Sequence, residues 1–337
     1  MGSGAYCDDG TEYATPYYHQ GTGTINTLVL SLLSMIAEMK ENVIFAMEEP
    51  ETALPPHIPK RVVLSVIEKS TQALFTSHSP YVLEEFSPDN ILTITKYNGE
   101  LCAIPAGMPP AVKPKKYREE FRKRFCESLL SRRVLITEGR TEYDVYMTAA
   151  RKLQSLHPNE SYAFELLGIS LVNAETDTQI SKLGSYYMAL NKIVYAVFDK
   201  QTNDASKEIR ENVNFAYEAD EHGIENVVLK YMEFSTLLRY GLHLVSENEW
   251  PQHLIAKKPN SPMTSDELYN ALFEFFKWGK GNGSLADLIE FCGEEEMPPF
   301  IKEAINSIRT TIYPTEELHK DHGQNSEVST DQAETLE

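Results

Sequence analysis

The sequence predicts an α/β protein, because short apolar strands alternate with amphipathic helices along most of the chain. Several of the strands end in acidic residues, as strands do at the ligand-binding edge of an open parallel sheet. The alternation runs twice, and a loop rich in Pro and Lys, GMPPAVKPKK, separates the two runs. A chain of 337 residues is long enough for two ordinary domains.

The first run contains helices, strands and a hairpin. We expect a largely buried helix over 25–40, because its apolar residues occupy too many faces for a surface helix. Apolar runs over 43–47 and 73–76 predict buried strands, and a helix is expected between them at 58–69. Two alternating strands then meet at Asn98-Gly99, a dipeptide typical of a two-residue hairpin turn.

The second run begins with a basic helix over 117–130. The elements expected after it are listed in chain order: strand 134–137, helix 143–153, strands 164–167 and 169–172, helix 180–190, strand 193–198, strand-like 226–234 and helix 265–277. The final stretch is polar, acidic and without aromatic residues, so we expect it to be disordered.

Composition limits the class of protein. The apolar fraction of 42% and the charged fraction of 24% are those of a soluble globular protein. No apolar run approaches the roughly 20 residues of a membrane span, and the N-terminus lacks the features of a signal peptide, so we expect a cytoplasmic protein without a membrane partner. The net charge of −19 argues against nonspecific polyanion binding by the whole surface.

The four cysteines carry no metal or disulfide signal. Cys7, Cys102, Cys126 and Cys292 stand far apart, and no two of them form a CxxC pair. The sequence therefore indicates neither a zinc site nor a disulfide framework.

An unusual turn follows the strand at 134–137, in the stretch VLITEGRTE. The strand stops at Glu138-Gly139 and a helix begins, so Glu138 stands at the strand's carboxyl end and Glu142 one helical turn later. Two converging carboxylates suit a hard divalent cation. The alternative is an ordinary pair of solvated glutamates on a helix surface.

A second acidic strand end, IFAMEEPE, resembles the Walker B strand of ABC-type ATPases. The resemblance implies that Glu48 holds Mg²⁺ through water and that Glu49 polarises the attacking water. In FTSHSP, His78 is placed like the switch histidine that senses the γ-phosphate. Gly21 and Gly23 lie where an ABC signature loop would precede Walker B, or form an ordinary glycine-rich turn.

The phosphate-binding half of an ATP site is absent from the sequence. No G-x-x-x-x-G-K-[ST] motif occurs anywhere, so nothing cradles the phosphates. The chain therefore resembles the C-terminal portion of an ATPase domain. ATP would act only with a Walker A segment supplied from elsewhere.

Taken together, EEPE, SHSP and TEGRTE, followed by a buried strand ending in an acid, resemble the OLD (overcoming lysogenisation defect) nuclease family. Its members, which include the Gabija nuclease subunit, join an ABC ATPase to a TOPRIM domain. The resemblance implies a partial ABC-type ATPase lobe over 1–110, a Rossmann-like TOPRIM domain with a helical extension over 111–310, and an acidic tail over 311–337.

The resemblance also implies a divalent-metal phosphodiesterase that uses Mg²⁺ or Mn²⁺. Glu138 and Glu142 would be the glutamates of the first TOPRIM motif, and Asp199 the first acid of the Asp-x-Asp motif. By position alone, Glu233 would be a later metal-binding acid, and Lys280 a lysine near the scissile phosphate. Such chemistry uses carboxylates to hold two cations at the displaced phosphorus and a lysine to stabilise its developing charge.

The chain departs from the family pattern at two places. Gln201 replaces the second acid of Asp-x-Asp, so one metal ligand becomes a neutral amide, and Asp204 is a candidate substitute if its loop folds back. The TOPRIM glycine motif is also missing, and VNAETD stands at 172–177 instead. Both departures remove features that the family pattern associates with two-metal activity.

The basic stretch KPKKYREEFRKRF is a candidate DNA-backbone contact. Its six basic residues are Lys115, Lys116, Arg118, Arg122, Lys123 and Arg124. The alternative is a solvated helix face whose cations pair with neighbouring glutamates.

The function that these observations favour is Mg²⁺-dependent cleavage or nicking of DNA, in bacterial defence against phage as the resemblance implies. The expected partners are DNA and either further copies of this chain or an ATPase- or helicase-type chain. The competing reading is a catalytically weakened regulatory or assembly subunit, which Gln201 and the missing P-loop favour. A TOPRIM primase or topoisomerase fits less well, because no zinc-binding cysteine set accompanies the pattern.

Overall fold

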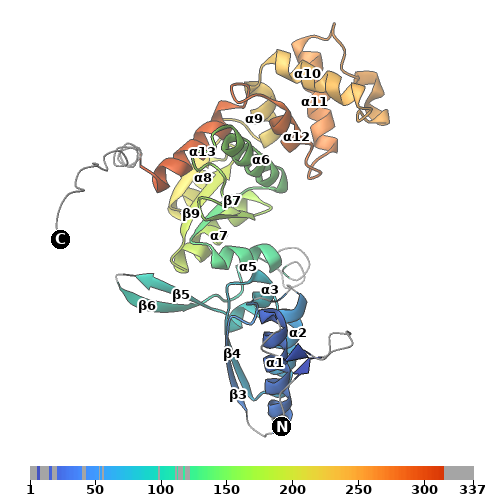
Figure 1. Cartoon of the computed structure of the whole chain (residues 1–337). Helices are drawn as coiled ribbons and strands as arrows, with labels where there is room; N and C mark the ends of the chain where they lie inside the picture. The colour runs from blue at the N-terminus through green and yellow to red at the C-terminus, as the bar shows by residue number, and fades with distance from the viewer. Residues whose placement is uncertain are drawn as a thin grey trace, which may run out of the picture. The chain divides into compact units, whose positions relative to one another are not determined.

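The computed structural model describes residues 6–7, 15–16, 21–39, 43–52, 54, 57–97, 99–110, 112, 117 and 122–314. The chain forms two compact units, Met1–Leu130 and Ser131–Glu337 (Figure 1). The α/β class expected from the sequence is confirmed, since both units contain parallel strand pairs and helices.

The division between the units lies after Leu130 and not after residue 110 as expected. Helix α5 (Arg122–Leu130), which the sequence assigned to the second domain, packs against the short helix α3 (Pro80–Leu83) of the first unit. Its side chains Phe125 and Cys126 are fully buried, and Phe125 makes an edge contact with Tyr117. This packing, rather than the proline-rich loop, decides where the first unit ends.

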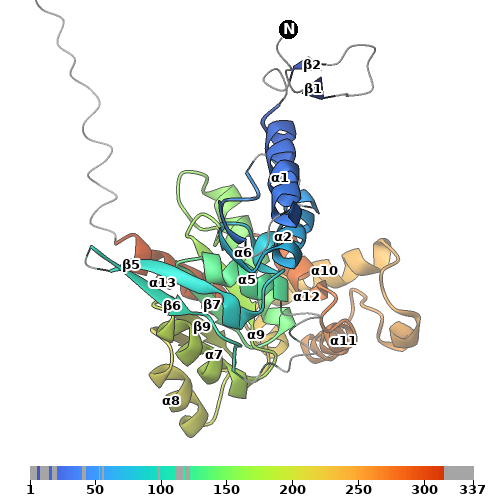
Figure 2. The same cartoon turned by 90° about the horizontal axis from the view of Figure 1, so that it is seen from below.

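The first unit contains eleven described elements. In chain order these are β1 (Tyr6–Cys7), β2 (Thr15–Pro16), α1 (Thr22–Met39), β3 (Ile44–Glu48), α2 (His57–Lys69), β4 (Gln72–Thr76), α3, the short 3-10 helix η2 (Pro88–Asn90), β5 (Leu92–Tyr97), β6 (Glu100–Pro105) and α5. Strands β3 and β4 pair in parallel, β5 and β6 form the expected antiparallel hairpin, and β1 pairs with β2. Helices α1 and α2 lie side by side (Figure 2).

The expected burial of this unit's first elements is wrong. Along β3 and β4 alternate side chains are exposed, among them Ile44 at 68% and Leu74 at 56%. In the part of the chain that is described, these two strands pair only with each other, so one face of a sheet normally covered on both sides stays open. Helix α1 likewise exposes Leu32 and Met35.

The described part of the second unit contains thirteen elements. They are β7 (Arg133–Thr137), α6 (Arg140–Leu156), β8 (Ile169–Asn173), α7 (Asp177–Ala189), β9 (Ile193–Phe198), α8 (Asn203–Glu211), β10 (Phe215–Glu218), α9 (Ile224–Tyr231), α10 (Phe234–Ser246), the 3-10 helix η4 (Gln252–Lys257), α11 (Ser265–Trp278), α12 (Ser284–Phe291) and α13 (Pro299–Ile312). Strand β9 follows the sequence expectation residue for residue, whereas β10 was not expected.

A four-stranded sheet organises this unit, with strand order β10-β9-β7-β8 and every neighbouring pair parallel. Helix α6 contacts β7 and β8 and carries α12 and α13, whereas α7 contacts β7 and β9 from the opposite face and α8 packs beside it (Figure 1). Leu135 and Tyr195 belong to the main core with α6, and Tyr195 bonds Thr311 of α13 through its hydroxyl at 2.7 Å. A buried parallel sheet results, with all strand carboxyl ends at one edge.

Two expected strands are wrong. Residues 164–167 form turns in which Phe164 and Leu167 are buried. The stretch 226–234 belongs mostly to helix α9, whose Val227, Val228 and Leu229 are buried in the core. A short apolar run does not distinguish a strand from a buried helix, and here the packing against α11 decided for helix.

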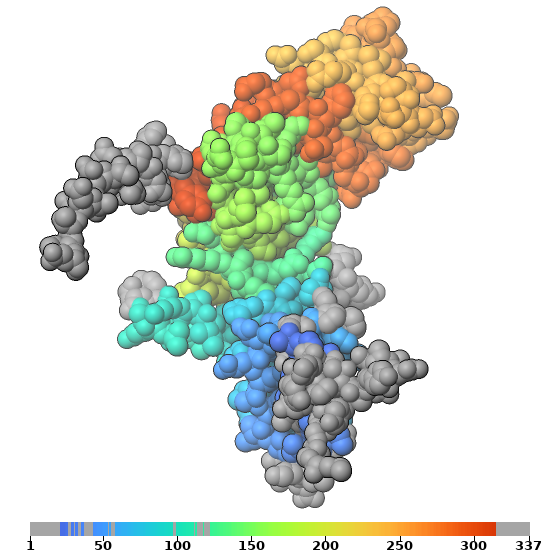
Figure 3. Space-filling model, viewed as in Figure 1, coloured from blue at the N-terminus to red at the C-terminus, as the bar shows by residue number. Residues whose placement is uncertain are grey.

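The helical extension is formed by α9 to α12, and α10 and α11 appear as one orange mass in the surface view of Figure 3. Helix α13 continues through Ile312, so the expected acidic tail cannot begin at residue 311, and its part from residue 315 lies outside the described residues. Of the described helices, none is long and apolar enough to cross a membrane.

Gly184 in α7 lies where a side chain has no room, because a Cβ there would stand 2.2 Å from the carbonyl oxygen of Asn212. We predict that Gly184→Ala lowers the free energy of unfolding by about 1–3 kcal/mol, since α7 must move away from the α8–β10 turn. Thermal unfolding followed by circular dichroism measures this. The exposed substitution Lys182→Ala on the same helix is the control, and equal melting temperatures for the two variants would contradict the close approach.

Candidate functional site

The pairing of β7 with β9 brings Glu138 and Asp199 together. Thr137 of β7 lies opposite Val197 of β9 in the parallel register, so Glu138 and Asp199 leave neighbouring strands at the same edge. The backbone N–H of Asp199 donates to Oε2 of Glu138 at 3.4 Å. The strand register itself therefore brings Glu138 and Asp199 together.

The turn from β7 into α6 places Glu142 in the same region. Gly139 has ordinary extended backbone angles, but a Cβ on it would stand 2.6 Å from Oε2 of Glu142. The carboxylate of Glu142 thus folds back over the glycine. The turn is fixed by Thr137, which is fully buried and donates through its hydroxyl to the carbonyl of Gly139 at 3.1 Å.

A fourth carboxylate joins this edge from α9. Glu225 is only 9% exposed in the first turn of that helix, and its charge acts on the carboxyl of Glu142. The preceding Gly223 donates its backbone N–H to Oδ2 of Asp199. Glu225 was not among the acids expected at this edge, because a strand and not a helix was expected over 226–234. The available signal was a glycine followed by an acid at the start of an apolar helical stretch.

The carboxylates raise one another's proton affinity. Burial, contact with Asp199 and the charge of Glu142 raise the pKa of Glu138 from its ordinary value of 4.5 to about 8. Burial is also the main cause that raises the pKa of Glu142, helped by the charges of Glu225 and Asp199 and opposed by the charge of Lys280. Crowded carboxyl groups of this kind are characteristic of functional sites.

Gln201 lies between two of these carboxylates. Its side-chain Nε2 donates to Oδ1 of Asp199 at 2.7 Å and to Oε2 of Glu138 at 3.3 Å. Asp204, the suggested substitute acid, is exposed in the first turn of α8 and is not the side chain that returns to Asp199. The position expected to carry a second metal-binding acid thus carries a hydrogen-bond donor.

A small cavity lies beside Glu142 and Asp199. It holds about 10 Å³ of water-accessible space, and Tyr146 and Phe198 also line it. Tyr146 is 1% exposed, and its hydroxyl has no hydrogen-bond partner among the described residues. The rest of the lining is apolar, from Ala219, Ile224, Val227 and Phe300, so the cavity offers few polar partners to a water molecule or an ion.

The residue types at this edge suit a divalent cation, but their side chains are not close enough together to hold one. Glu138, Glu142, Asp199 and Glu225 offer the all-oxygen donor set that Mg²⁺ and Mn²⁺ prefer. Within the residues that the structure describes, however, no three His, Cys, Asp or Glu side chains are already arranged to hold a metal. The carboxylates would have to draw together around a cation.

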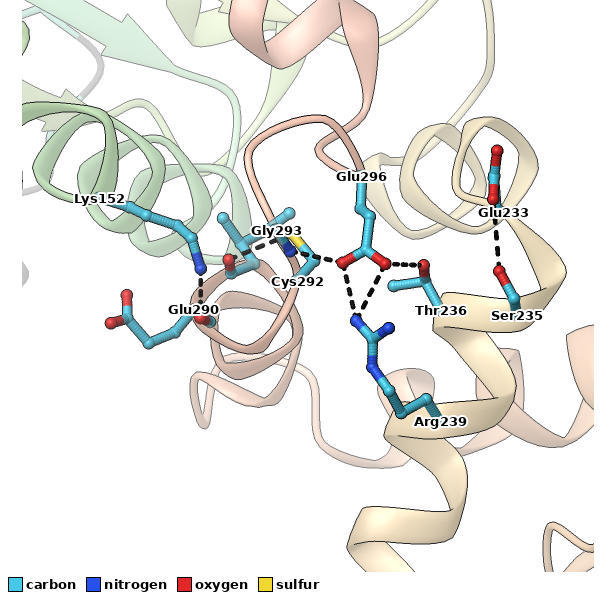
Figure 4. A network of polar contacts seen from close by, with 10 residues as sticks. Lys152, Glu233, Ser235, Thr236, Arg239, Glu290, Cys292, Gly293 and Glu296 are labelled. Atoms are coloured by element: carbon cyan, nitrogen blue, oxygen red, sulfur yellow. Dashed lines mark hydrogen bonds and ion pairs between the residues drawn. The ribbon is translucent and has the colours of Figure 1, made fainter. Parts of the chain in front are cut away.

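Lys280 and Glu233, two further expected site residues, differ in their relation to the four carboxylates. Lys280 is exposed in the turn after α11, and its charge reaches Glu142. Glu233 is exposed at the start of α10 and accepts a hydrogen bond from Ser235 at 3.3 Å (Figure 4). Sequence position placed Glu233 in the site, whereas the structure brings Glu225 there instead.

Figure 4 shows a hydrogen-bond network around Glu296, here called the Glu296 clasp, which also contains Thr236, Arg239 and Gly293. Glu296, before α13, accepts hydrogen bonds from Arg239 at 2.7 Å and from the hydroxyl of Thr236 at 2.8 Å. These bonds, with the N–H of Gly293, lower the pKa of Glu296 to about 2. The clasp joins α10 to the turn between α12 and α13.

In the first unit, the two ATPase-like motifs meet at the ends of β3 and β4. Glu48 is exposed at the end of β3, and Glu49 follows with a positive φ of 44°, an uncommon conformation for this residue. Nε2 of His78 lies 3.9 Å from Oε1 of Glu49. Glu51, which the sequence did not single out, accepts hydrogen bonds from the Ser77 hydroxyl at 2.9 Å and the His78 N–H at 2.8 Å.

The structure describes some of the remaining expected residues and not others. Gly21 precedes α1 and is exposed, and Gly23 lies in its first turn. Of the basic stretch, Lys115, Lys116 and Arg118 lie outside the described residues. Arg122 and Arg124 are half-buried on α5, and the exposed Lys123 holds its ammonium 5.5 Å from the ring centre of Tyr81.

Comparison with known proteins finds similarity among solved structures. The C-terminal region of the Burkholderia pseudomallei OLD protein is 18% identical with a TM-score of 0.37, covering 54% of this chain and 98% of that one. The C-terminal region of the Xanthomonas campestris pv. campestris OLD protein is 17% identical with a TM-score of 0.35, covering 57% and 99%. No family model matches the chain. No curated protein matches it either.

The raised pKa of Glu138 predicts a pH-dependent cost in stability for the cation-free protein. Between pH 4.5 and about pH 8, Glu138 is ionised in the unfolded chain but favours its protonated form in the folded chain. The free energy of unfolding therefore decreases as the pH rises through this range. We predict that Glu138→Gln has a free energy of unfolding about 1 kcal/mol higher than the wild type at pH 8 in EDTA, after discounting for solvent screening, and therefore a higher melting temperature. At pH 5 the two proteins should differ little.

Differential scanning calorimetry at the two pH values measures this effect. Glu211→Gln, an exposed substitution at the end of α8, is the control and should shift neither curve. A wild type as stable as Glu138→Gln at pH 8 would show that the four carboxylates are not crowded in solution.

Proposed function

We propose that this chain is a divalent-cation-dependent nuclease of the OLD type that nicks or cleaves DNA. The observation that carries the proposal is the convergence of Glu138, Glu142, Asp199 and Glu225 at the carboxyl edge of one parallel sheet. These four residues would hold Mg²⁺ or Mn²⁺. A bound cation would supply positive charge to the phosphate and activate water for attack at phosphorus.

The chain's own residues divide the remaining work. The raised pKa of Glu138 favours its protonated form while the site is free of cations, and cation binding would favour the carboxylate. Lys280, exposed and within electrostatic reach of Glu142, would bind the scissile phosphate and stabilise its developing negative charge. Asp199 is oriented through both carboxylate oxygens, by Gln201 and by the N–H of Gly223.

The first unit would regulate this nuclease. Glu48, Glu49 and His78, with Gly21 and Gly23 facing a nucleotide, would respond to ATP only with a Walker A segment from elsewhere. That segment would come from a partner ATPase or helicase-type chain or from another copy in an oligomer. The basic stretch, including Arg122, Lys123 and Arg124, would contact the DNA backbone, and the biological role would be defence of bacteria against phage.

A second candidate function is a regulatory or assembly subunit without nuclease activity. The observation that favours it is the amide of Gln201, which donates to two carboxylates where a metal ligand is expected. The open β3–β4 face, with Ile44 and Leu74 exposed, suits a surface that another chain completes.

Nicking of supercoiled plasmid with Mg²⁺ or Mn²⁺ separates these candidates. We predict that the wild type produces open-circle or linear DNA and that Glu142→Gln, Asp199→Ala and Glu225→Gln each reduce the rate by at least about 100-fold, because each removes a cation ligand. Glu211→Gln is the matched control and should retain full activity. If the wild type and all variants are equally inert, with and without a P-loop partner, the subunit function is favoured.

The role of Gly139 gives a separate prediction. Gly139→Ala introduces a Cβ that displaces the carboxylate of Glu142, so we expect nicking to slow by about 10- to 100-fold. The melting temperature should barely change, because the atom that must move is the end of a flexible side chain and the backbone angles suit alanine. A fully active variant would show that Glu142 does not depend on the bare backbone at this turn.

A further inference from the structure

An exposed tryptophan ends helix α11 in the helical extension (Figure 1). Trp278 is 56% exposed, whereas the other tryptophan of the chain, Trp250, is 7% exposed and stacks on Phe275 with ring centres 5.2 Å apart. A single exposed apolar side chain is common on protein surfaces, so the surroundings of Trp278 decide whether it has a role.

The ring of Trp278 is held in place by two neighbouring rings. The ring centre of His253, in η4, lies 5.2 Å from that of Trp278, and the ring centre of Phe275 lies 6.3 Å from it. Phe275 is only 4% exposed, so it anchors the exposed ring to the core. A side chain fixed in this way loses little conformational entropy when another flat ring stacks on it.

Two lysines without ion pairs accompany Trp278. Lys277 precedes it and Lys280 follows it by two residues, and both are exposed. Among the described residues neither forms an ion pair, whereas Lys257 of the adjoining η4 pairs with Glu274. In a chain of net charge −19, two unpaired lysines next to an exposed ring give this surface local positive charge. Such charge favours an anionic ligand, and a phosphodiester backbone is one.

The loop after α11 leaves room for the backbone of a ligand. Gly281 and Gly283 have positive φ angles of 81° and 91°, and a Cβ on either would meet no atom within 4 Å. Bare backbone therefore faces open space next to Lys280. The charge of Lys280 acts on Glu142, so the loop lies within electrostatic reach of the carboxylate edge. A strand that stacks on Trp278 can pass over this loop to that edge.

An unpaired base fits this surface better than a duplex does. In a duplex each base face is covered by its neighbours in the stack, and proteins reach only the base edges and the phosphates. In single-stranded DNA the base faces are free, and bases stack on aromatic side chains while cationic side chains follow the backbone. Trp278 offers the ring, and Lys277 and Lys280 offer the charge.

We propose that Trp278, with His253 beside it, is a base-stacking platform for an unpaired stretch of DNA whose neighbouring phosphates contact Lys277 and Lys280. The inference rests on the proposed nuclease function and deepens it, because it assigns a single-stranded segment as the part of the substrate that this surface recognises. Stacking needs no divalent cation, so binding at Trp278 and cleavage at the carboxylate edge can be measured separately.

The fluorescence of Trp278 reports stacking directly. Trp250→Phe leaves Trp278 as the one tryptophan of the full-length chain, and its emission is followed while oligothymidylate of about 15 nucleotides is added in EDTA. We expect saturable quenching by the single strand. A duplex of the same length should need an about 10-fold higher concentration for the same quenching, because its base faces are covered.

Binding of fluorescein-labelled oligothymidylate, measured by anisotropy in EDTA with Trp250 retained, tests the individual residues. Trp278→Ala should raise the dissociation constant by about 10-fold, and Trp278→Phe, which keeps a ring, by at most about threefold. Tyr313→Ala removes another exposed aromatic ring, directly after α13, and is the matched control that should bind like the wild type. Lys277→Gln should reduce the salt dependence of binding by about one phosphate contact.

Three results would each overturn the platform. They are equal affinities for Trp278→Ala and Tyr313→Ala, quenching of Trp278 by the duplex as strong as by the single strand, and no binding of oligothymidylate to the wild type. The plasmid-nicking assay would still decide the nuclease proposal by itself. Conversely, binding that depends on Trp278 in a chain that never nicks DNA would uphold the platform and count against the nuclease.

Discussion

Repulsion among four carboxylates held at one edge of a parallel sheet is the constraint on which the second unit depends. The register of β7 with β9 forces Glu138 and Asp199 together, and the turn and helix that follow add Glu142 and Glu225. Without a cation, the protein relieves this repulsion with a raised proton affinity at Glu138, an amide at Gln201 and a backbone N–H at Gly223. Each device lowers negative charge or donates a hydrogen bond to it.

Such an arrangement costs stability, and the rest of the unit offsets the cost. The sheet is covered on both faces, with α6, α12 and α13 on one side and α7 on the other, so the strands beneath the acids are almost completely buried. The Glu296 clasp fixes the helical extension through charged hydrogen bonds. A rigid sheet keeps the acids close together even though separation would lower their energy.

In the first unit, local sequence patterns predicted the positions of several elements but not their burial. The strands β3 and β4, the hairpin and α2 lie close to where alternation and turn residues placed them, because these signals are local. The contact between Glu49 and His78 also follows from two strand ends that pair in parallel. The expected burial of these strands was wrong, because Ile44 and Leu74 are exposed. An apolar side chain can be buried only where another element packs against its face of the sheet.

The sequence alone determined the α/β class, the strands β7 and β9, and the strand-to-helix turn that carries Glu138 and Glu142, because residue type and period are properties of short segments. Only the tertiary structure decided that Glu225 and not Glu233 approaches Glu142, that α9 is a helix, and that α5 belongs to the first unit. It also decided that the side chain of Gln201 turns back between Glu138 and Asp199. These outcomes depend on contacts between residues distant along the chain, such as Gln201 with Glu218 and Asp199 with Gly223, which no local pattern encodes.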